Sequence, residues 1–157
     1  MTNPLVPGSL TGKVAVVTGS SRGIGADTAR YLAHGARIVF VTSHQAHFIR
    51  TTPTMPEYEP VALSKRAGED ALRAKLPELD AAGVEFVTVS GDMIEGTITA
   101  TLLERANPGA IEARKVDAGR LYNVSEFAAE VASAAVDPIP ADHTRYVGDV
   151  SGFTPEG

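Results

Sequence analysis

The chain has 157 residues, and 43% hydrophobic with 21% charged side chains is an ordinary composition for a folded domain with one core. A net charge of −5 argues against a general binder of nucleic acid or anionic membranes, and the lack of cysteine excludes disulfides, thiolate metal sites and a cysteine nucleophile. No apolar run reaches membrane-spanning length and the first residues lack a signal-peptide pattern, so a cytoplasmic location is expected.

Short apolar runs alternate with amphipathic segments along the chain, which predicts an α/β fold with a mostly parallel sheet covered by helices. Residues 107–120 are rich in turn-forming residues and carry no clear prediction. The expected elements are strand 13–18, helix 23–33, strand 36–43, helix 57–80 with a break at Pro77, strand 84–90, helix 97–106, helix 125–136 with Ser125 as its N-cap, and strand 143–150.

A glycine-rich loop, TGSSRGIG at residues 18–25, follows the first expected strand and opens the first expected helix. Glycines in this position permit a tight turn and let the backbone approach a bound group. The start of the helix then offers unpaired N–H groups and a positive dipole end to a pyrophosphate. A packing role for the glycines is the alternative, and the P-loop is disfavoured because no Gly-Lys-Ser/Thr follows.

The stretch KVAVVTGSSRGIGADTARYLA resembles the opening of the short-chain dehydrogenase/reductase family. The resemblance implies a Rossmann-like three-layer sandwich formed by one domain, 1–157, with a reduced sheet of about four strands. Arg22 resembles the basic residue that many NADP-preferring members carry, so NADP(H) is favoured over NAD(H); a solvated surface charge is the alternative. The implied cofactor-binding residues are Thr18, Gly19, Ser20, Ser21, Arg22, Gly23, Ile24, Gly25, Lys65 and Thr97.

The family's chemistry uses a serine, a tyrosine and a lysine, because a tyrosine titrates near 10 and needs a nearby cation to act near neutral pH. GARIVFVTS resembles the family's fifth strand and places Ser43 at the catalytic serine, while YEPVALSKRAGEDALRA resembles the following helix with Lys65 as the lysine. Val61 stands four residues before Lys65, where the tyrosine is usual. Tyr58 precedes Lys65 by seven residues, about two helical turns, and this spacing is similar to that of enoyl-acyl carrier protein reductases.

Each of the three residues has a structural alternative. Ser43 can be a strand-end hydroxyl bonded to the backbone, Tyr58 an aromatic side chain that covers a helix start, and Lys65 a solvated helix lysine. GDMIEGTITATL resembles the segment after the family's sixth strand and places Thr97 or Thr99 near the cofactor amide, although Gly91-Asp92 replaces the usual Pro-Gly pair.

Other polar pairs carry weaker predictions. His44 and His47 lack a third ligand at suitable spacing, so no metal site is expected, and His44 is interpreted as lining a pocket. Asp92 and Glu95 are interpreted as solvated loop carboxylates.

Part of the family pattern is missing between the two matching blocks. No residue that would read the ribose, no Asn-Asn-Ala-Gly-like segment and no long helix precede Ser43, which indicates an internal deletion between about residues 33 and 35. A rival alignment makes ARIVFV the second strand, but the short distance to TSHQAHF and the lysine helix favours the fifth. The fifth-strand alignment conflicts with right-handed crossovers, because the first helix leads to one side of the first strand and the family's fifth strand lies on the other. A four-stranded sheet then requires that the first helix change face or that a strand change its position in the order.

The resemblance implies an NAD(P)(H)-dependent oxidoreductase that transfers hydride to or from a carbonyl or enoyl group of a small-molecule substrate, with no nucleic-acid or membrane partner. The alternatives are a non-catalytic remnant and a nucleotide-binding module without turnover. Lost strands would expose apolar sheet edges, which favours association into a homo-oligomer.

Overall fold

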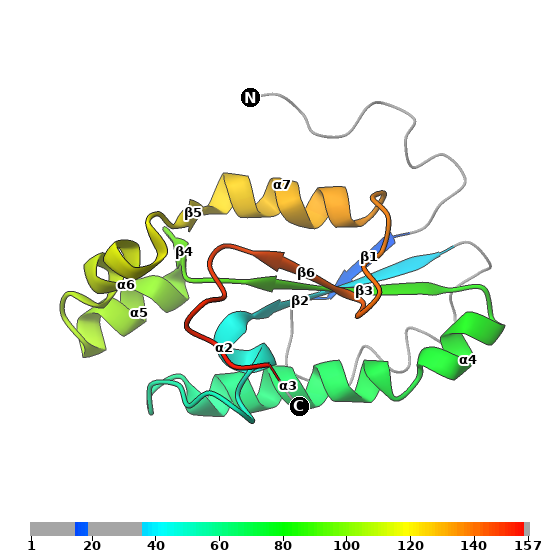
Figure 1. Ribbon diagram of the computed structural model, residues 1–157, viewed down its shortest axis with the longest axis horizontal. Helices are drawn as coiled ribbons and strands as arrows, with labels where there is room; N and C mark the ends of the chain where they lie inside the picture. Colours follow the sequence, from blue (N-terminus) through cyan, green and yellow to red (C-terminus); the bar gives the residue numbers. More distant parts are fainter. Residues whose placement is uncertain (1–14, 19–35, 156–157) are drawn as a thin grey trace.

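The computed structural model describes residues 15–18 and 36–155 and has a mixed α/β fold built on a small parallel sheet. Its elements, in chain order, are β1 (Ala15–Thr18), β2 (Arg37–Ser43), α2 (His44–His47), α3 (Glu59–Arg73), α4 (Leu76–Ala81), β3 (Glu85–Gly91), β4 (Ile94–Glu95), α5 (Ile98–Ala106), α6 (Ala110–Ala118), β5 (Tyr122–Asn123), α7 (Val124–Ala134) and β6 (Thr144–Val147) (Figure 1).

The sheet has the order β1-β2-β3-β6, and every neighbouring pair is parallel. The register places Ser43 beside Gly91, so β2 and β3 end together, and it places Thr18, the last residue of β1, beside Phe40. Parallel pairing therefore brings the carboxyl ends of β2, β3 and β6 to one edge of the sheet, and β1 points toward this edge but ends three residues before it. Strand β2, for which the sequence left open alignment with the family's fifth or second strand, lies directly beside β1.

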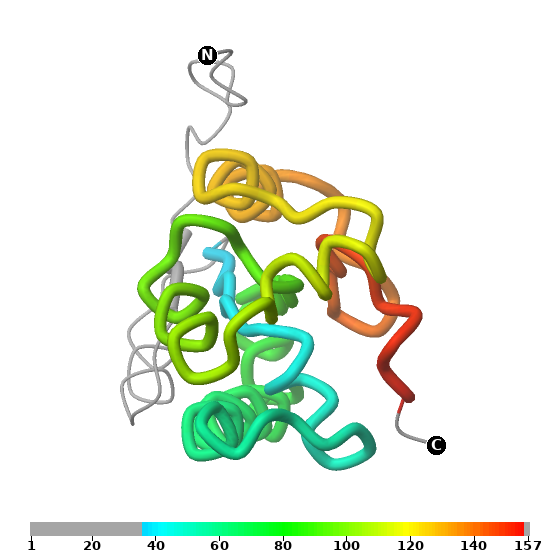
Figure 2. Tube along the Cα trace, turned by 90° about the vertical axis from the view of Figure 1, so that its left-hand side faces the viewer, coloured from blue at the N-terminus to red at the C-terminus, as the bar shows by residue number. Residues whose placement is uncertain are grey.

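Alternating side chains of the strands form a core on each face of the sheet. Ile38, Phe40 and Phe86 pack against Leu72 of α3 and Leu79 of α4. The residues between them point to the other face, where the core contains Val39, Val87, Val89, Ala134, Ala135 and Val147. Figures 1 and 2 show α7 on this second face and α3 on the first, so helices cover both sides of the sheet.

A third cluster lies beyond the carboxyl edge rather than on a face. It joins Ala46 of α2 and Ala62 of α3 to Ala100 and Leu103 of α5, with Tyr58, Met93 and Leu121 buried among them. This cluster fixes α5 and α6 at the end of the sheet where the strands finish, as Figure 1 shows.

The two described connections between neighbouring strands have opposite hands. The path from β2 to β3 runs through α3 on one face, and the path from β3 to β6 runs through α7 on the other, although both step the same way along the sheet. One of the two crossovers is therefore left-handed, which is rare among parallel connections.

The expected strands are present, with ends within a few residues of those predicted, and helix 57–80 is broken into α3 and α4 with Pro77 in the first turn of α4. The Ser125 prediction is wrong: Asn123 caps α7 and Ser125 lies inside it. The helices α2 and α6 and the short pair β4-β5 were not predicted. The expected helix 23–33 and the expected deletion point at 33–35 lie outside the described residues.

Candidate functional site

Ser43 ends β2 and begins α2, and its side chain serves both elements. Its Oγ accepts a hydrogen bond from the Ala46 N–H at 3.2 Å, which caps α2. The same oxygen lies 2.9 Å from the phenol oxygen of Tyr58 and shares a hydrogen bond with it. The predicted serine and tyrosine are therefore in direct contact, while the alternative of a hydroxyl bonded to the backbone also describes Ser43.

Tyr58 immediately precedes α3, where Pro60 occupies the first turn and costs no intrahelical hydrogen bond. Its ring is 6% exposed and packs in the cluster at the carboxyl edge. Val61, at the spacing from Lys65 that is usual in the family, is 43% exposed. The structure therefore directs Tyr58 inward, and not the residue at position 61.

Lys65 lies two turns along α3 and is half-buried. It lines the same cleft as Ser43 and Tyr58. Within the described part of the chain its ammonium group makes no hydrogen bond or ion pair. The cleft is thus lined by a lysine without a partner among the described residues and by two joined hydroxyl groups.

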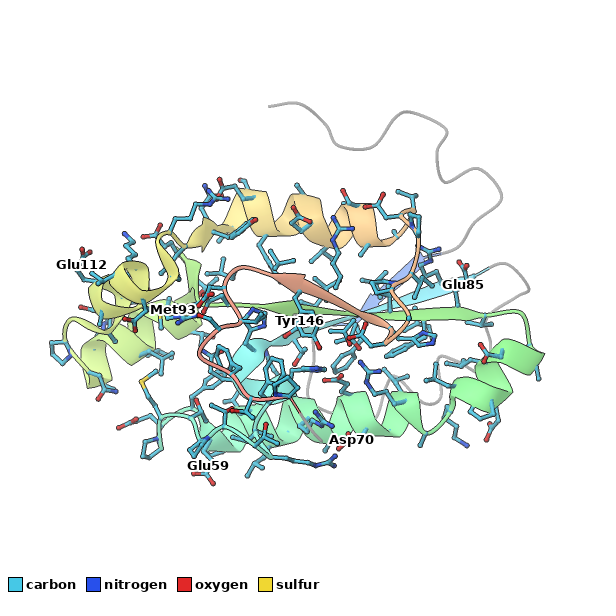
Figure 3. The ribbon with its side chains drawn as sticks, viewed as in Figure 1. Glu59, Asp70, Glu85, Met93, Glu112 and Tyr146 are labelled. Atoms are coloured by element: carbon cyan, nitrogen blue, oxygen red, sulfur yellow. The ribbon has the colours of Figure 1, made fainter. Side chains whose placement is uncertain are left out.

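The cleft that these residues line has a volume of about 410 Å³, within the range of small-molecule sites. Figure 3 shows Met93, one of the lining residues, where β3 leads toward α5 and α6. Glu59, the neighbour of Tyr58, lies at the same end of the molecule. The full lining is Val41, Thr42, Ser43, Gln45, Tyr58, Lys65, Asp92, Met93, Ile94, Thr97, Thr99, Ala100, Leu103, Val124, Phe127, Ala128 and Val131.

Thr97 and Thr99 both lie at the cleft, but their hydroxyl groups differ in availability. Thr97 is the N-cap of α5: its Oγ1 accepts from the Ala100 N–H at 3.1 Å and donates to the Ile94 carbonyl at 2.9 Å. Thr99 is exposed to solvent. Of the two threonines expected near the cofactor amide, Thr99 is thus the one whose hydroxyl is not used in the cap.

Sequence analysis interpreted Asp92 and Glu95 as solvated, and both are in fact paired. Asp92 is 4% exposed and accepts hydrogen bonds from the Arg114 guanidinium at 2.8–3.1 Å and from the Met93 N–H at 2.7 Å. Arg114 also bonds Asp149, which follows β6. Glu95 pairs with Lys115 at 2.5 Å. Arg114 is thereby a support of the site that the sequence did not reveal.

The interpretation of His44 as a pocket-lining residue is wrong. His44 is fully buried away from the cleft, with its Nδ1 2.8 Å from the Ser90 Oγ. His47 instead contacts the carboxylate of Glu69 at 2.9 Å. Among the described residues no three His, Cys, Asp or Glu side chains are grouped so as to hold a metal ion.

Sequence analysis also missed the wall that α7 contributes. Val124, Phe127, Ala128 and Val131 recur at helical spacing and line the cleft along one stripe. Gly91 permits this wall to approach, because a Cβ atom at position 91 would lie 2.5 Å from the Phe127 Cε2. The spacing signal was present in the sequence, but it indicated only a buried helix face.

The glycine loop cannot be placed against the cleft. Residues 19–25, and with them the expected pyrophosphate contacts and Arg22, lie outside the described residues, as do the side chains of β1. What the structure gives is the starting point of the loop, since β1 ends at Thr18 beside Phe40.

Comparison with known protein families, with curated proteins and with solved structures finds no significant match to the chain. In the two described stretches of the chain, no helix has the length and apolar character needed to cross a bilayer.

Proposed function

We propose that this chain is an NADP(H)-dependent oxidoreductase of the short-chain dehydrogenase/reductase type with a reduced Rossmann-like fold. One observation carries the proposal. Ser43, Tyr58 and Lys65, to which the sequence resemblance assigns roles in hydride transfer, line a single cleft, and the hydroxyl oxygens of Ser43 and Tyr58 are hydrogen-bonded at 2.9 Å. One of the three residues ends a strand, one immediately precedes α3 and one lies within α3. The fold therefore brings them to the same cleft.

The described residues fit the hydride-carrying end of such a cofactor. The cleft lies beyond the carboxyl edge of a parallel sheet, where ligands of this fold class bind. β1 runs parallel to β2 toward the same edge and ends at Thr18, beside Phe40 and three residues short of the register position of Ser43. The unpaired ammonium group of Lys65 supplies a hydrogen-bond donor that suits a sugar hydroxyl.

Ser43 and Tyr58 would act together on a substrate carbonyl. Their hydroxyl groups donate hydrogen bonds to the carbonyl oxygen and hold its carbon in one orientation. The Tyr58 proton passes to that oxygen as the carbon gains a hydride, so C=O becomes CH–OH. The positive charge of Lys65 stabilises the negative charge that remains on the Tyr58 oxygen. NADPH, when bound, supplies the hydride and leaves as NADP⁺.

A second candidate, a nucleotide-binding chain without turnover, is favoured by the structural use of the same residues. Ser43 caps α2 and Tyr58 packs in the apolar cluster at the carboxyl edge. Both contacts would be kept in a chain that has lost its chemistry.

The first experiment titrates NADPH and NADH separately, following nicotinamide fluorescence and thermal stability. Binding at a hundredfold excess over Kd raises the free energy of unfolding by about 2.7 kcal/mol. NADPH is expected to bind more tightly, and Arg22→Ala is expected to weaken NADPH alone. Absence of any shift with both nucleotides refutes the oxidoreductase, and binding without oxidation on ketones, aldehydes and enoyl thioesters supports the second candidate.

The second experiment removes the proton donor. Tyr58→Phe is expected to lower turnover by about 10²-fold or more, because the carbonyl oxygen loses its acid. Tyr146→Phe is the matched control, since Tyr146 lies on β6 and does not line the cleft. Equal turnover in the two variants would remove Tyr58 from the chemistry.

A further inference from the structure

The two ends of the cleft differ in chemical character. Ser43, Tyr58 and Lys65 come from the end of β2 and from the α3 region, whereas a stripe of α7 contributes the other end. Figures 1 and 2 show α3 and α7 on opposite sides of the sheet, so the cleft passes across the carboxyl edge from a polar end to an apolar one. That stripe consists of Val124, Phe127, Ala128 and Val131.

The lining from β3 to α5 is mostly apolar. It includes Met93, Ile94, Ala100 and Leu103, together with Thr97 and Thr99. A guest that lies along this lining exchanges water for hydrocarbon contacts, which favours binding in proportion to the apolar area buried.

The charged residues of the described lining are Lys65, at the polar end, and Asp92. The carboxylate of Asp92 is already held by Arg114 and by the Met93 N–H, and Arg114 does not line the cleft. A carboxylate at the far end of a guest, beside α7, would therefore meet no cation among the described residues, and leaving a charge unpaired beside an apolar wall is costly.

The size of the cleft suits a guest with a chain. Its volume of about 410 Å³ lies within the range of sites for small organic molecules. A small polar metabolite would leave most of the apolar wall uncovered.

We propose that the substrate is a carbonyl compound with an apolar, uncharged chain, whose carbonyl lies at Ser43 and Tyr58 and whose chain lies along α7. The carbonyl chemistry rests on the proposed function, whereas the preference for an uncharged chain rests on the cleft alone.

The test measures binding of 2-alkanones, from 2-butanone upward, to the cofactor-free protein by calorimetry and thermal shift. Each added CH₂ group is expected to lower Kd by about fourfold, and the gain is expected to stop once the chain extends past the α7 wall. Keto acids of equal length, with the carboxylate at the far end of the chain, are expected to bind about tenfold more weakly or worse. A Kd that does not change with chain length, or such keto acids binding as tightly as the ketones, would overturn the proposal.

Three variants of α7 test whether the alkyl chain of the substrate lies along this helix. Ala128→Phe adds six non-hydrogen atoms at an exposed lining position, so the chain-length limit is expected to fall by about that number. Ala129→Phe, beside it but outside the lining, should leave the limit unchanged. Val124→Phe, also exposed, gives a second block should Ala128→Phe fail to fold. An unchanged limit in the folded lining variants contradicts the placement along α7.

The polar end is tested with the same ketones. Tyr58→Phe is expected to raise Kd roughly two- to tenfold for every chain length, because one hydrogen bond is lost and the apolar contacts remain. A ketone series that behaves as expected without NADPH binding refutes the proposed function alone. Turnover with NADPH but no dependence on chain length refutes the substrate class alone.

Discussion

His44 is a buried, neutral histidine in the core beneath the site. It is fully shielded from solvent, and its ring lies against Phe48, Tyr146 and Phe153. The Nε2 atom has no hydrogen-bond partner among the described residues. Burial lowers the pKa of His44 to about 4, although the carboxylate of Asp92 acts in the opposite direction. The folded state therefore excludes the proton that the unfolded state accepts.

This exclusion predicts a pH dependence of stability. The unfolded histidine titrates near 6.5, so below that pH the unfolded state binds more protons and the free energy of unfolding falls with pH. The stabilisation is fully present above about pH 6.5, and about 2 kcal/mol of it is expected to be lost between pH 7 and pH 5. Urea unfolding at the two pH values measures the loss, and His44→Gln should reduce it. A loss of equal size in His44→Gln would contradict the assignment.

At the scale of single residues, the sequence predicted the members of the site better than their partners. Ser43 and Lys65 were predicted from the resemblance of GARIVFVTS and YEPVALSKRAGEDALRA to segments of the family, and Tyr58 from a spacing to Lys65 that is similar to that of one branch of it. Arg114 did not follow, because it contacts Asp92 across 22 residues of chain through a fold that local pattern does not specify. His44 was misplaced because a strand end does not reveal which side of it faces the core.

At the scale of elements, hydrophobic periodicity predicted those helices that bury an apolar face and missed those held by polar caps. α6 buries none of its residues, so its sequence carries no apolar stripe. Its start is held instead by the Glu104 carboxylate of α5, which accepts hydrogen bonds from the N–H groups of Gly109 and Ile111. α2 has only four residues, which is too short for any period to show.

The correction at the start of α7 gives a prediction with a built-in control. Asn123 and Glu126 form a capping box, in which each side chain accepts a hydrogen bond from the other's backbone N–H at 2.9 Å. Asn123→Ala is expected to lower the free energy of unfolding by about 1 kcal/mol, measured by chemical denaturation. Ser125→Ala should change it by less than about 0.5 kcal/mol, since Ser125 lies past the cap. The reverse order of effects would restore Ser125 as the cap.

At the scale of the whole molecule, the mixed α/β fold with a small parallel sheet was predictable and the strand order was not. Buried, valine-rich runs such as residues 84–90 indicate parallel strands wherever they stand in the sheet. The placement of β1 directly beside β2, and the opposite hands of the two described crossovers, depend on long-range packing. The right-handed rule by itself would have placed α3 and α7 on one face.

Arg114 joins the parts of the molecule that meet at the carboxyl edge. From α6 it bonds Asp92 after β3 and Asp149 after β6, so three separate segments converge on one guanidinium group. Its hydrogen bonds and ion pairs with Asp92, working against burial, raise the pKa of Arg114 above its usual value, so it stays charged throughout the stable pH range.

Arg114→Met is therefore expected to be far more damaging than its position near the surface implies. The side chain of Asp92 is 2% exposed, and removing its partner leaves a buried carboxylate unpaired, at a cost of about 3 kcal/mol in the free energy of unfolding. Arg105→Met, on the neighbouring helix α5 and exposed, is the matched control and should cost less than about 0.5 kcal/mol. Replacing Asp92 by Asn in the Arg114→Met background should restore part of the loss, because the uncompensated charge is then gone. Denaturant unfolding of the unchanged protein, the two single variants and the double variant measures these free energies. Equal losses of unfolding free energy in Arg114→Met and Arg105→Met would mean that packing of the cluster around Leu103, and not this ion pair, holds the carboxyl edge.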